Sequence, residues 1–196
     1  MELFARDGYF QTSVPDIQRR AEVSVGSIYR HFASKDDLAA AVYDLVLETV
    51  GDLFRRNLEG NADFLTRFSG LLGDLFRLTE ETPHLVEYAL YVKHREIGRD
   101  IGPICSSEPF RYLQARVADA MRAGQLRAGE VVLTTATLTG PALRLIQLHL
   151  DGLLLTPLTA ALDPLMDNAR RALAPDPAPS APAPGGRAGR PRRRTA

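Results

Sequence analysis

The chain has 196 residues, with 24 lysines and arginines against 24 aspartates and glutamates, so its formal net charge is zero. A hydrophobic share of 45% and a charged share of 24% are ordinary for a globular protein, and no run reaches the roughly 18 uninterrupted apolar residues of a membrane helix. The single cysteine, Cys105, excludes an internal disulfide and a cysteine-based zinc site. We therefore expect a cytoplasmic protein with no membrane partner, no metal and no other cofactor.

The neutral total hides an uneven distribution of charge. Residues 175–196 are rich in Pro, Ala and Gly and carry five arginines against one aspartate, a net of +4. We expect this tail to be disordered, because it has almost nothing to bury. Residues 1–174 therefore carry a net of −4. The basic tail fits either a solvated extension or an auxiliary, non-specific contact with phosphates.

Residues 1–34 are predicted to form three short helices separated by tight turns. The first covers residues 1–7. Ser13 is suited to cap the second, because its side chain can accept from a free amide while Asp16 bonds back from three residues later. Ser24 is suited to cap the third in the same way.

The third helix has an inward face and an outward face. Ile28 and Phe32 lie four residues apart and are expected to point inward, which leaves small and hydrogen-bonding side chains for the surface. Two short helices joined by a four-residue turn are typical of a helix-turn-helix. In that motif the second helix enters the major groove and its first residues reach the base edges.

The rest of the chain to residue 174 is predicted to be all-α. Apolar residues recur there at three- and four-residue spacing, and Gly or Pro separates the successive segments. The predicted helices cover residues 35–57, 62–80, 82–97, 106–123, 129–150 and 157–173. We expect Pro141 to interrupt or kink the fifth of them.

At this point the sequence resembles a known family. The segments GYFQTSVPDI and VSVGSIYRHFASKDDL are similar to the DNA-binding region of the TetR (tetracycline-repressor) family of bacterial regulators. The residues that carry the resemblance are Phe4, Gly8, Tyr9, Thr12, Ser13, Ile17, Ala21, Val23, Ser24, Gly26, Ile28, Tyr29, His31, Phe32, Ser34, Lys35 and Leu38. Beyond about residue 50 the similarity is one of plan only.

The resemblance implies an architecture and a function. We expect a three-helix helix-turn-helix domain at residues 1–47, a helical ligand-binding and dimerisation domain at 48–174, and the tail at 175–196. The implied protein is a homodimeric transcriptional regulator, expected to be a repressor, that binds a palindromic operator in double-stranded DNA. A small-molecule effector in the second domain would release it.

The resemblance also implies which residues contact DNA through a recognition helix at residues 24–31. Recognition-helix contacts are implied at Ser24, Val25, Ser27 and Tyr29, although Tyr29 also fits a partly packed role. Phosphate contacts are implied at Thr12 or Ser13, His31 and Lys35. Arg30 is expected either to contact the DNA backbone or to be solvated. The hydroxyl, imidazole and ammonium groups suit phosphate oxygens, which fix register without reading sequence. Ser13 and Ser24 would also be favoured as helix caps in any protein.

The sequence departs from the family pattern at its start. The first helix of the family normally begins further upstream, whereas this chain starts inside it, and residues 1–47 carry a net of −2. We therefore expect either a true start upstream of Met1 or an impaired affinity for DNA. The alternative function is a small-molecule-binding or interaction dimer that has lost DNA binding.

The second half offers weaker signals for a ligand and a second copy of the chain. Tyr88, Tyr91 and Arg144 are the candidate ligand contacts, chosen for their size and hydrogen-bonding groups, although each also fits a core or surface role. The helices at 129–150 and 157–173 are too apolar for an exposed face and are expected to pair across a two-fold axis.

An enzyme is not expected. The histidines lack metal-ligand spacing, and Cys105 has no evident activating partner.

Overall fold

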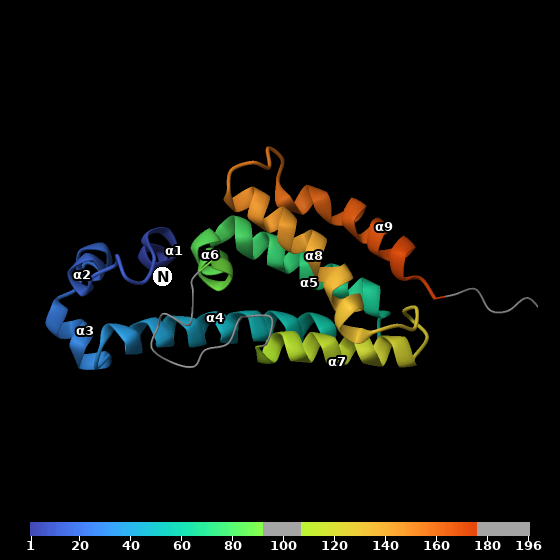
Figure 1. The fold of residues 1–196 in the computed structure, drawn as a ribbon, viewed down its shortest axis with the longest axis horizontal. Coiled ribbons are helices and arrows are strands. Elements are labelled where there is room, and N and C mark those ends of the chain that lie inside the picture. The colour runs from blue at the N-terminus through green and yellow to red at the C-terminus, as the bar shows by residue number, and fades with distance from the viewer. Residues whose placement is uncertain (92–106, 176–196) are drawn as a thin grey trace, which may run out of the picture.

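The computed structural model describes residues 1–91 and 107–175, and every regular element in these two ranges is helical. Three short helices, α1 (Glu2–Asp7), α2 (Val14–Ala21) and α3 (Val25–His31), form one end of the molecule (Figure 1). The 24-residue helix α4 (Lys35–Leu58) leads from that end along the rest of the protein. The all-α prediction is confirmed for the described residues.

The second part of the chain is a helical bundle around the far half of α4. Its elements are α5 (Phe64–Glu81), α6 (Pro83–Tyr91), α7 (Glu108–Arg122), α8 (Val131–Leu150), a 3₁₀ turn at Leu158–Ala161 and α9 (Leu162–Leu173). In Figure 1, α7 runs beside α4, while α5, α8 and α9 lie on the other side. Helix α6 is short and sits between this bundle and α1.

The predicted helix caps explain where the first helices begin. The Ser13 side chain accepts from the Asp16 amide, and the Asp16 carboxylate accepts from the Ser13 amide at 3.0 Å, which completes the expected capping box. Ser24 accepts from the amide of Ser27 at 3.0 Å, and Ser34 accepts from an amide at the start of α4, also at 3.0 Å. Each bond satisfies an amide that has no partner within the helix.

The core joins the two parts of the chain. Val46 and Leu58 of α4 are fully buried, and so are Phe68 and Phe76 of α5. Near the first three helices, Phe4 of α1 is 2% exposed and contributes to the same apolar cluster. Because one core runs through both parts, α4 and α6 hold the helix-turn-helix end firmly against the bundle.

The structure bears on two expectations about the fifth predicted helix. Helix α8 continues through Pro141, which is exposed, so the proline does not interrupt the helix. By length and composition α8 is also apolar enough to cross a membrane, although core helices of soluble proteins pass the same test. The expected disorder of the tail and the end of the helix predicted at 82–97 lie outside the described residues.

Candidate functional site

The outer surface of α3 presents the residues expected to read DNA. Ser24, Tyr29, Arg30 and His31 are exposed, and Val25 and Ser27 are half-buried. Ile28 on the opposite face is 8% exposed, so the predicted inward face is confirmed there, while Phe32 is half-buried. The helix is therefore anchored by one side and free to meet a partner with the other.

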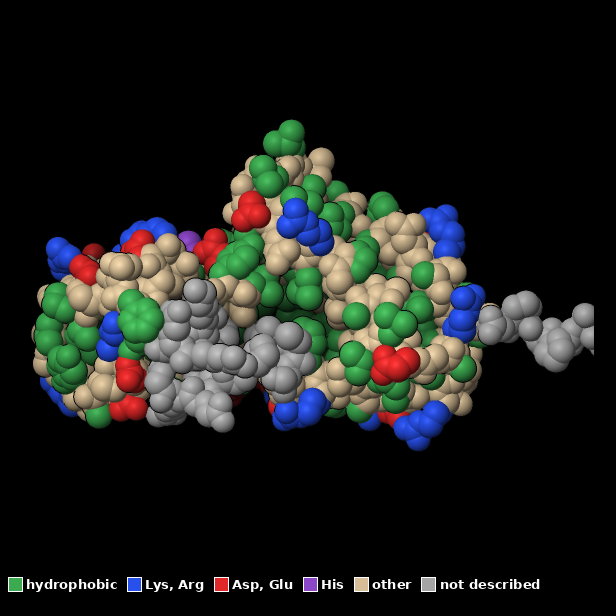
Figure 2. All heavy atoms as spheres, viewed as in Figure 1, with side chains coloured by type: hydrophobic (Ala, Val, Ile, Leu, Met, Phe, Trp, Pro, Cys, Tyr) green, Lys and Arg blue, Asp and Glu red, His purple; other side chains and the backbone are tan. Residues whose placement is uncertain are grey.

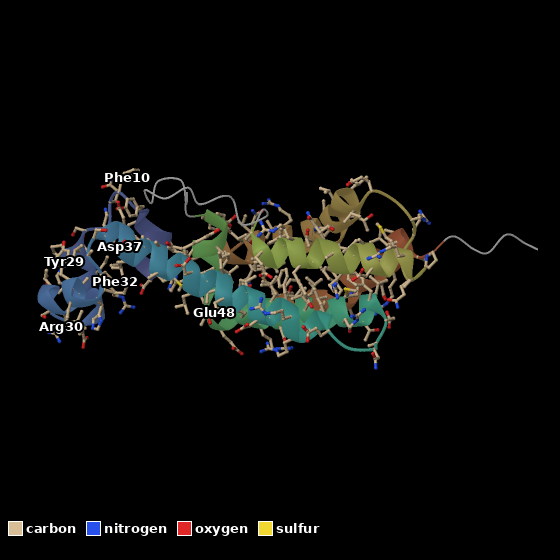
Figure 3. The ribbon with its side chains drawn as sticks, turned by 90° about the horizontal axis from the view of Figure 1, so that it is seen from below. Phe10, Tyr29, Arg30, Phe32, Asp37 and Glu48 are labelled. Carbon is tan, nitrogen blue, oxygen red and sulfur yellow. The ribbon has the colours of Figure 1, made fainter. Side chains whose placement is uncertain are left out.

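Aromatic side chains stand out at this end of the molecule. Tyr29 is 51% exposed and Phe10, in the turn between α1 and α2, is 68% exposed. Figure 3 shows Tyr29 and Arg30 at the α3 end, and Phe10 at the edge nearest the turn that precedes α2. The exposure of Phe10 was not predicted from the sequence, because an aromatic residue next to Tyr9 would ordinarily be assigned to the core.

Lys35 holds the turn that precedes α2. Its Nζ donates to the carbonyl of Tyr9 at 3.0 Å and to the carbonyl of Thr12 at 3.1 Å, and it lies 4.2 Å from the centre of the Tyr9 ring. The Tyr9 hydroxyl in turn donates to the Asp36 carboxylate. An ammonium has three N–H donors, so one remains for a phosphate. The implied phosphate contact at Lys35 is thus compatible with its structural role.

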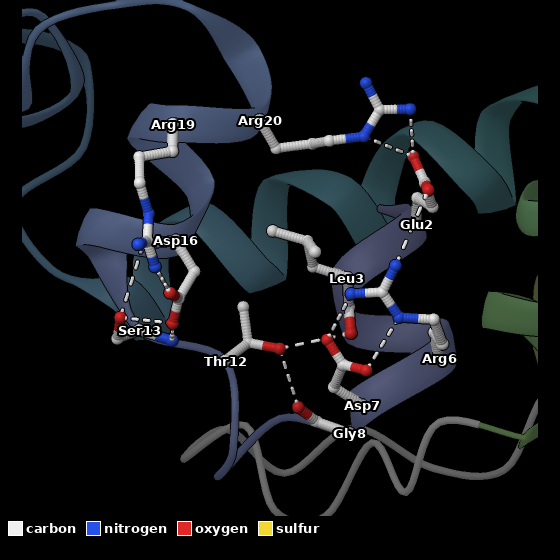
Figure 4. Close-up of polar contacts among 10 residues, drawn as sticks. All are labelled: Glu2, Leu3, Arg6, Asp7, Gly8, Thr12, Ser13, Asp16, Arg19 and Arg20. Atoms are coloured by element: carbon white, nitrogen blue, oxygen red, sulfur yellow. Dashed lines mark hydrogen bonds and ion pairs between the residues drawn. The ribbon is translucent and has the colours of Figure 1, made fainter.

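Thr12 differs from the expectation. Its side chain is 2% exposed, and its hydroxyl lies 2.9 Å from the carbonyl of Gly8 and 3.1 Å from that of Leu3, as Figure 4 shows. A buried hydroxyl that already bonds to the backbone cannot reach a phosphate. The structure therefore argues against a side-chain contact from Thr12 and leaves the neighbouring Ser13, which is exposed.

The charges around Ser13 are mostly paired with one another. The Ser13 hydroxyl bonds to the Asp16 carboxylate, and this bond with the other Ser13 contacts lowers the pKa of Asp16. Arg19 pairs with the same carboxylate, and Arg20 pairs with Glu2 at 2.6 Å (Figure 4). By contrast, Arg30 forms no ion pair with any residue in the described ranges. Its exposed guanidinium is thus not held by a described carboxylate.

An apolar cavity of about 360 Å³ lies in the bundle. Its wall includes Val50 and Phe54 of α4, Leu85 and Leu90 of α6, and Phe110 of α7, together with one face of α8. Figure 2 shows a hollow lined by hydrophobic side chains in the region between α6, α7 and α8. Sequence reasoning missed these residues, because at helical spacing they are indistinguishable from ordinary core positions.

None of the three residues predicted to contact a ligand lines this cavity. Tyr88 is fully buried and its hydroxyl donates to the carbonyl of Ala39 on α4 at 2.9 Å, so it points toward the helix-turn-helix end. Tyr91 is 43% exposed and Arg144 is exposed. On α6 the cavity takes positions 85, 86, 89 and 90, and residues 88 and 91 face other directions.

An apolar surface remains uncovered on α8 and the loop that follows it. Val132 is 57% exposed and Leu133 is 67% exposed at the start of α8, and Leu153 and Leu155 are 67% and 97% exposed in the loop. Only 28% of the most apolar stretch of α8 is buried within this chain. Among the described residues, no His, Cys, Asp and Glu side chains group in a way that could hold a metal ion.

Comparisons with known proteins agree with this architecture. Residues 1–42 match the model of the bacterial regulatory proteins of the tetR family. The HTH-type transcriptional regulator HbdR of Aromatoleum sp. (strain CIB) is 39% identical over 59 residues, which are 30% of this chain and 26% of that protein. The HTH-type transcriptional regulator AcrR of Shigella flexneri is 36% identical over 101 residues, 52% of this chain and 43% of that protein. The matches thus span less than half the length of these curated relatives.

A solved structure extends the likeness to most of the fold. The transcriptional regulator FadR of Bacillus subtilis, crystallised in complex with stearoyl-CoA, superposes with a TM-score of 0.69 at 20% identity. The superposition covers 86% of this chain and 92% of the FadR chain. Residues 1–42 are thus similar to the helix-turn-helix region of the tetR family, and most of the chain shares the helical fold of FadR.

Proposed function

We propose that this chain is a ligand-responsive repressor that binds a palindromic operator as a homodimer and is released by a small-molecule effector. The observation that carries the proposal is the outer surface of α3, where Ser24, Tyr29, Arg30 and His31 are exposed on a helix anchored by the buried Ile28. We place its action in the cytoplasm, and no catalytic step is part of the proposal.

DNA recognition is assigned to α3 and to the groups around its ends. The hydroxyl of Ser24 uses its oxygen as a helix cap and keeps its O–H for a base edge or a phosphate. Tyr29 offers a ring and a hydroxyl of its own. The third N–H of Lys35, the imidazole of His31 and the Arg30 guanidinium are assigned to phosphates, which position the helix in the groove.

The homodimer is assigned to the uncovered apolar surface of α8 and its following loop. A helix with 28% of its most apolar stretch buried leaves a large apolar face in water, which a second copy would cover. A two-fold axis would bring the same residues, Leu133 among them, together from both copies. The two α3 helices would then lie about 34–36 Å apart or a multiple of it, which matches successive major grooves.

Effector response is assigned to α4. This helix begins beside the helix-turn-helix and reaches the cavity at Val50 and Phe54, so one rigid element touches both sites. Suppose that a ligand binds more tightly to a conformation in which the two α3 helices do not match the spacing of the major grooves. That ligand would then weaken operator binding. The coupling requires different ligand affinities in the two states.

Fluorescence anisotropy with the intergenic DNA upstream of its own gene, at several salt concentrations, tests DNA binding. The variant Tyr29→Ala should weaken specific binding by about 1–2 kcal/mol, roughly 5- to 30-fold. Tyr91→Ala is the matched control, because Tyr91 is also an exposed tyrosine but lies on α6. A wild-type protein with no preference for upstream DNA over a scrambled duplex at low salt would sink the repressor proposal. It would favour the alternative, a ligand-binding dimer that does not bind DNA.

Sedimentation velocity tests the dimer. Leu133→Asp puts a charge on the uncovered surface of α8 and should convert the dimer to monomer without loss of helix content. Leu45→Asp is the control, because Leu45 is also exposed, at 51%, but lies on α4 away from this surface. Equal sedimentation of both variants as dimers would refute the assigned interface.

A further inference from the structure

The cavity wall is almost entirely apolar, and this limits the kind of ligand that the cavity can hold. Among the described residues that line it, no side chain is ionisable, and the polar ones are Gln114, Thr135 and Thr139. The free-energy cost of moving an ion from water into a cavity with such a wall is far greater than that of moving a neutral group, because no opposite charge or set of hydrogen bonds replaces the hydration of the ion. The wall therefore selects against a charged group inside the cavity.

The two threonines that line the cavity do not supply free hydrogen-bond donors to a ligand. The Thr135 hydroxyl donates to the carbonyl of Val131 at 2.8 Å, and the Thr139 hydroxyl donates to the carbonyl of Thr135 at 2.9 Å. With its single proton used in this way, each hydroxyl can only accept. Of the described lining residues, Gln114 is thus the side chain that can donate to a ligand without giving up a helix bond.

The volume sets the size of the occupant. A dry apolar cavity of about 150 Å³ accommodates a benzene molecule, so one of about 360 Å³ has room for roughly a dozen heavy atoms. This lies at the lower end of the range of ordinary ligand sites. The Gln114 amide comes from α7 and the threonines from α8, so the polar groups stand on two of the helices around the cavity.

We infer that the cavity binds an uncharged, largely apolar molecule that carries a single carbonyl or hydroxyl group, with that group hydrogen-bonded to Gln114. The inference deepens the proposed function, on which it rests for the role of the ligand as effector. A carbonyl oxygen would accept from the Gln114 amide, and a hydroxyl could also donate to its carbonyl or to a threonine oxygen. An ionised amphiphile of the same length would lose affinity at its head group.

Calorimetry on the DNA-free protein tests the inference with probes of matched size. 2-Undecanone and 1-decanol are expected to bind at least 30-fold more tightly than decanoate or decylammonium at pH 7.5. Ala89→Leu fills the cavity from α6 and should abolish binding of the two neutral probes while the protein stays folded. Equal or tighter binding of either ion, or neutral binding that survives Ala89→Leu, would overturn the inference.

The variant Gln114→Leu tests the polar contact separately. It should weaken 2-undecanone about 5- to 10-fold and leave butylbenzene, which has no polar group, unchanged or slightly tighter. Gln147→Leu is the matched control, since Gln147 is a half-buried glutamine on α8 that does not line the cavity. A ketone affinity unchanged in Gln114→Leu would refute the assigned contact. These binding measurements contain no DNA, so they are independent of the repressor proposal. If the protein fails to bind its operator but still prefers the neutral probes, the repressor proposal is refuted and this inference stands.

Discussion

The buried hydroxyl of Tyr88 ties the cavity helix to the DNA-binding end, and its removal has a calculable cost. Tyr88→Phe deletes one neutral hydrogen bond, that to the Ala39 carbonyl at 2.9 Å. The carbonyl keeps its bond within α4, so no acceptor is left wholly unpaired, and we expect a loss of about 1 kcal/mol in the free energy of unfolding. Tyr88→Ala also removes a ring that is fully buried and 6.3 Å from the ring of Phe4, and should cost about 3–5 kcal/mol.

The assay is urea denaturation followed by circular dichroism, with Tyr91→Phe as the control. Tyr91 is 43% exposed, so its variant should be within a few tenths of a kcal/mol of wild type. A Tyr88→Phe protein as stable as Tyr91→Phe would refute the assigned hydrogen bond.

The pH dependence gives a second readout of the same group. Burial raises the pKa of the Tyr88 phenol above its usual value. The neutral phenol is therefore favoured in the folded protein, and its contribution is present below the unfolded pKa of about 10 and lost as pH rises through the folded pKa. The stability gap between wild type and Tyr88→Phe should shrink above about pH 10. A gap that widens there would contradict a buried, neutral Tyr88.

Three further predictions concern local structure, each measured by urea denaturation. Glu22 has a φ of 56°, so Glu22→Gly should stabilise the protein by about 0.5–1 kcal/mol by relieving a left-handed backbone, whereas Glu22→Gln should not. Ser24→Ala removes the cap on the Ser27 amide and should cost about 1 kcal/mol, with no cost for Ser69→Ala inside α5. Bonds from Asn57 and then from nearby arginines lower the pKa of Asp74, so Asp74→Asn should cost about 1–2 kcal/mol at pH 7. This difference should fade as pH falls below about 4, because the stabilisation by a lowered pKa exists above the unfolded value.

The starts of the first helices were predictable because they depend on side-chain caps that lie within a few residues. Ser13 and Ser24 mark the starts of α2 and α3, and each forms the bond expected of it. Ser34 forms the same kind of bond at the start of α4. These interactions join residues three apart and depend little on the rest of the fold. The same holds for the inward face of α3, where a spacing of four residues places Ile28 in the core.

The candidate ligand contacts were not predictable by the same means. Adjacent residues on a helix point about 100° apart, so a sequence pattern cannot say whether Tyr88 or Ala89 faces a cavity until the packing of α6 is known. Size and hydrogen-bonding ability drew attention to Tyr88, yet the small Ala89 lines the space and the large side chain fills the junction with α4. Thr12 misled for a related reason, since only the path of the turn buries its hydroxyl.

A last prediction concerns the salt dependence of DNA binding, which reflects how many cationic groups can contact phosphates. At the helix-turn-helix end, Arg6, Arg19 and Arg20 are held in ion pairs, so among the described lysines and arginines of this end the groups left for phosphates are the Arg30 guanidinium and the third N–H of Lys35. A dimer would then neutralise about four phosphates, which gives a slope of about −4 for log K against log[salt]. The measurement is specific-operator anisotropy between low and physiological salt, on the full chain and on a chain ending at residue 175. Arg30→Gln should make the slope shallower by about 2 per dimer, whereas Arg19→Gln should leave it within 1. A slope steeper than about −8 in the chain ending at residue 175 would mean that the paired arginines leave their carboxylates for the DNA, and the contact assignment would then be wrong.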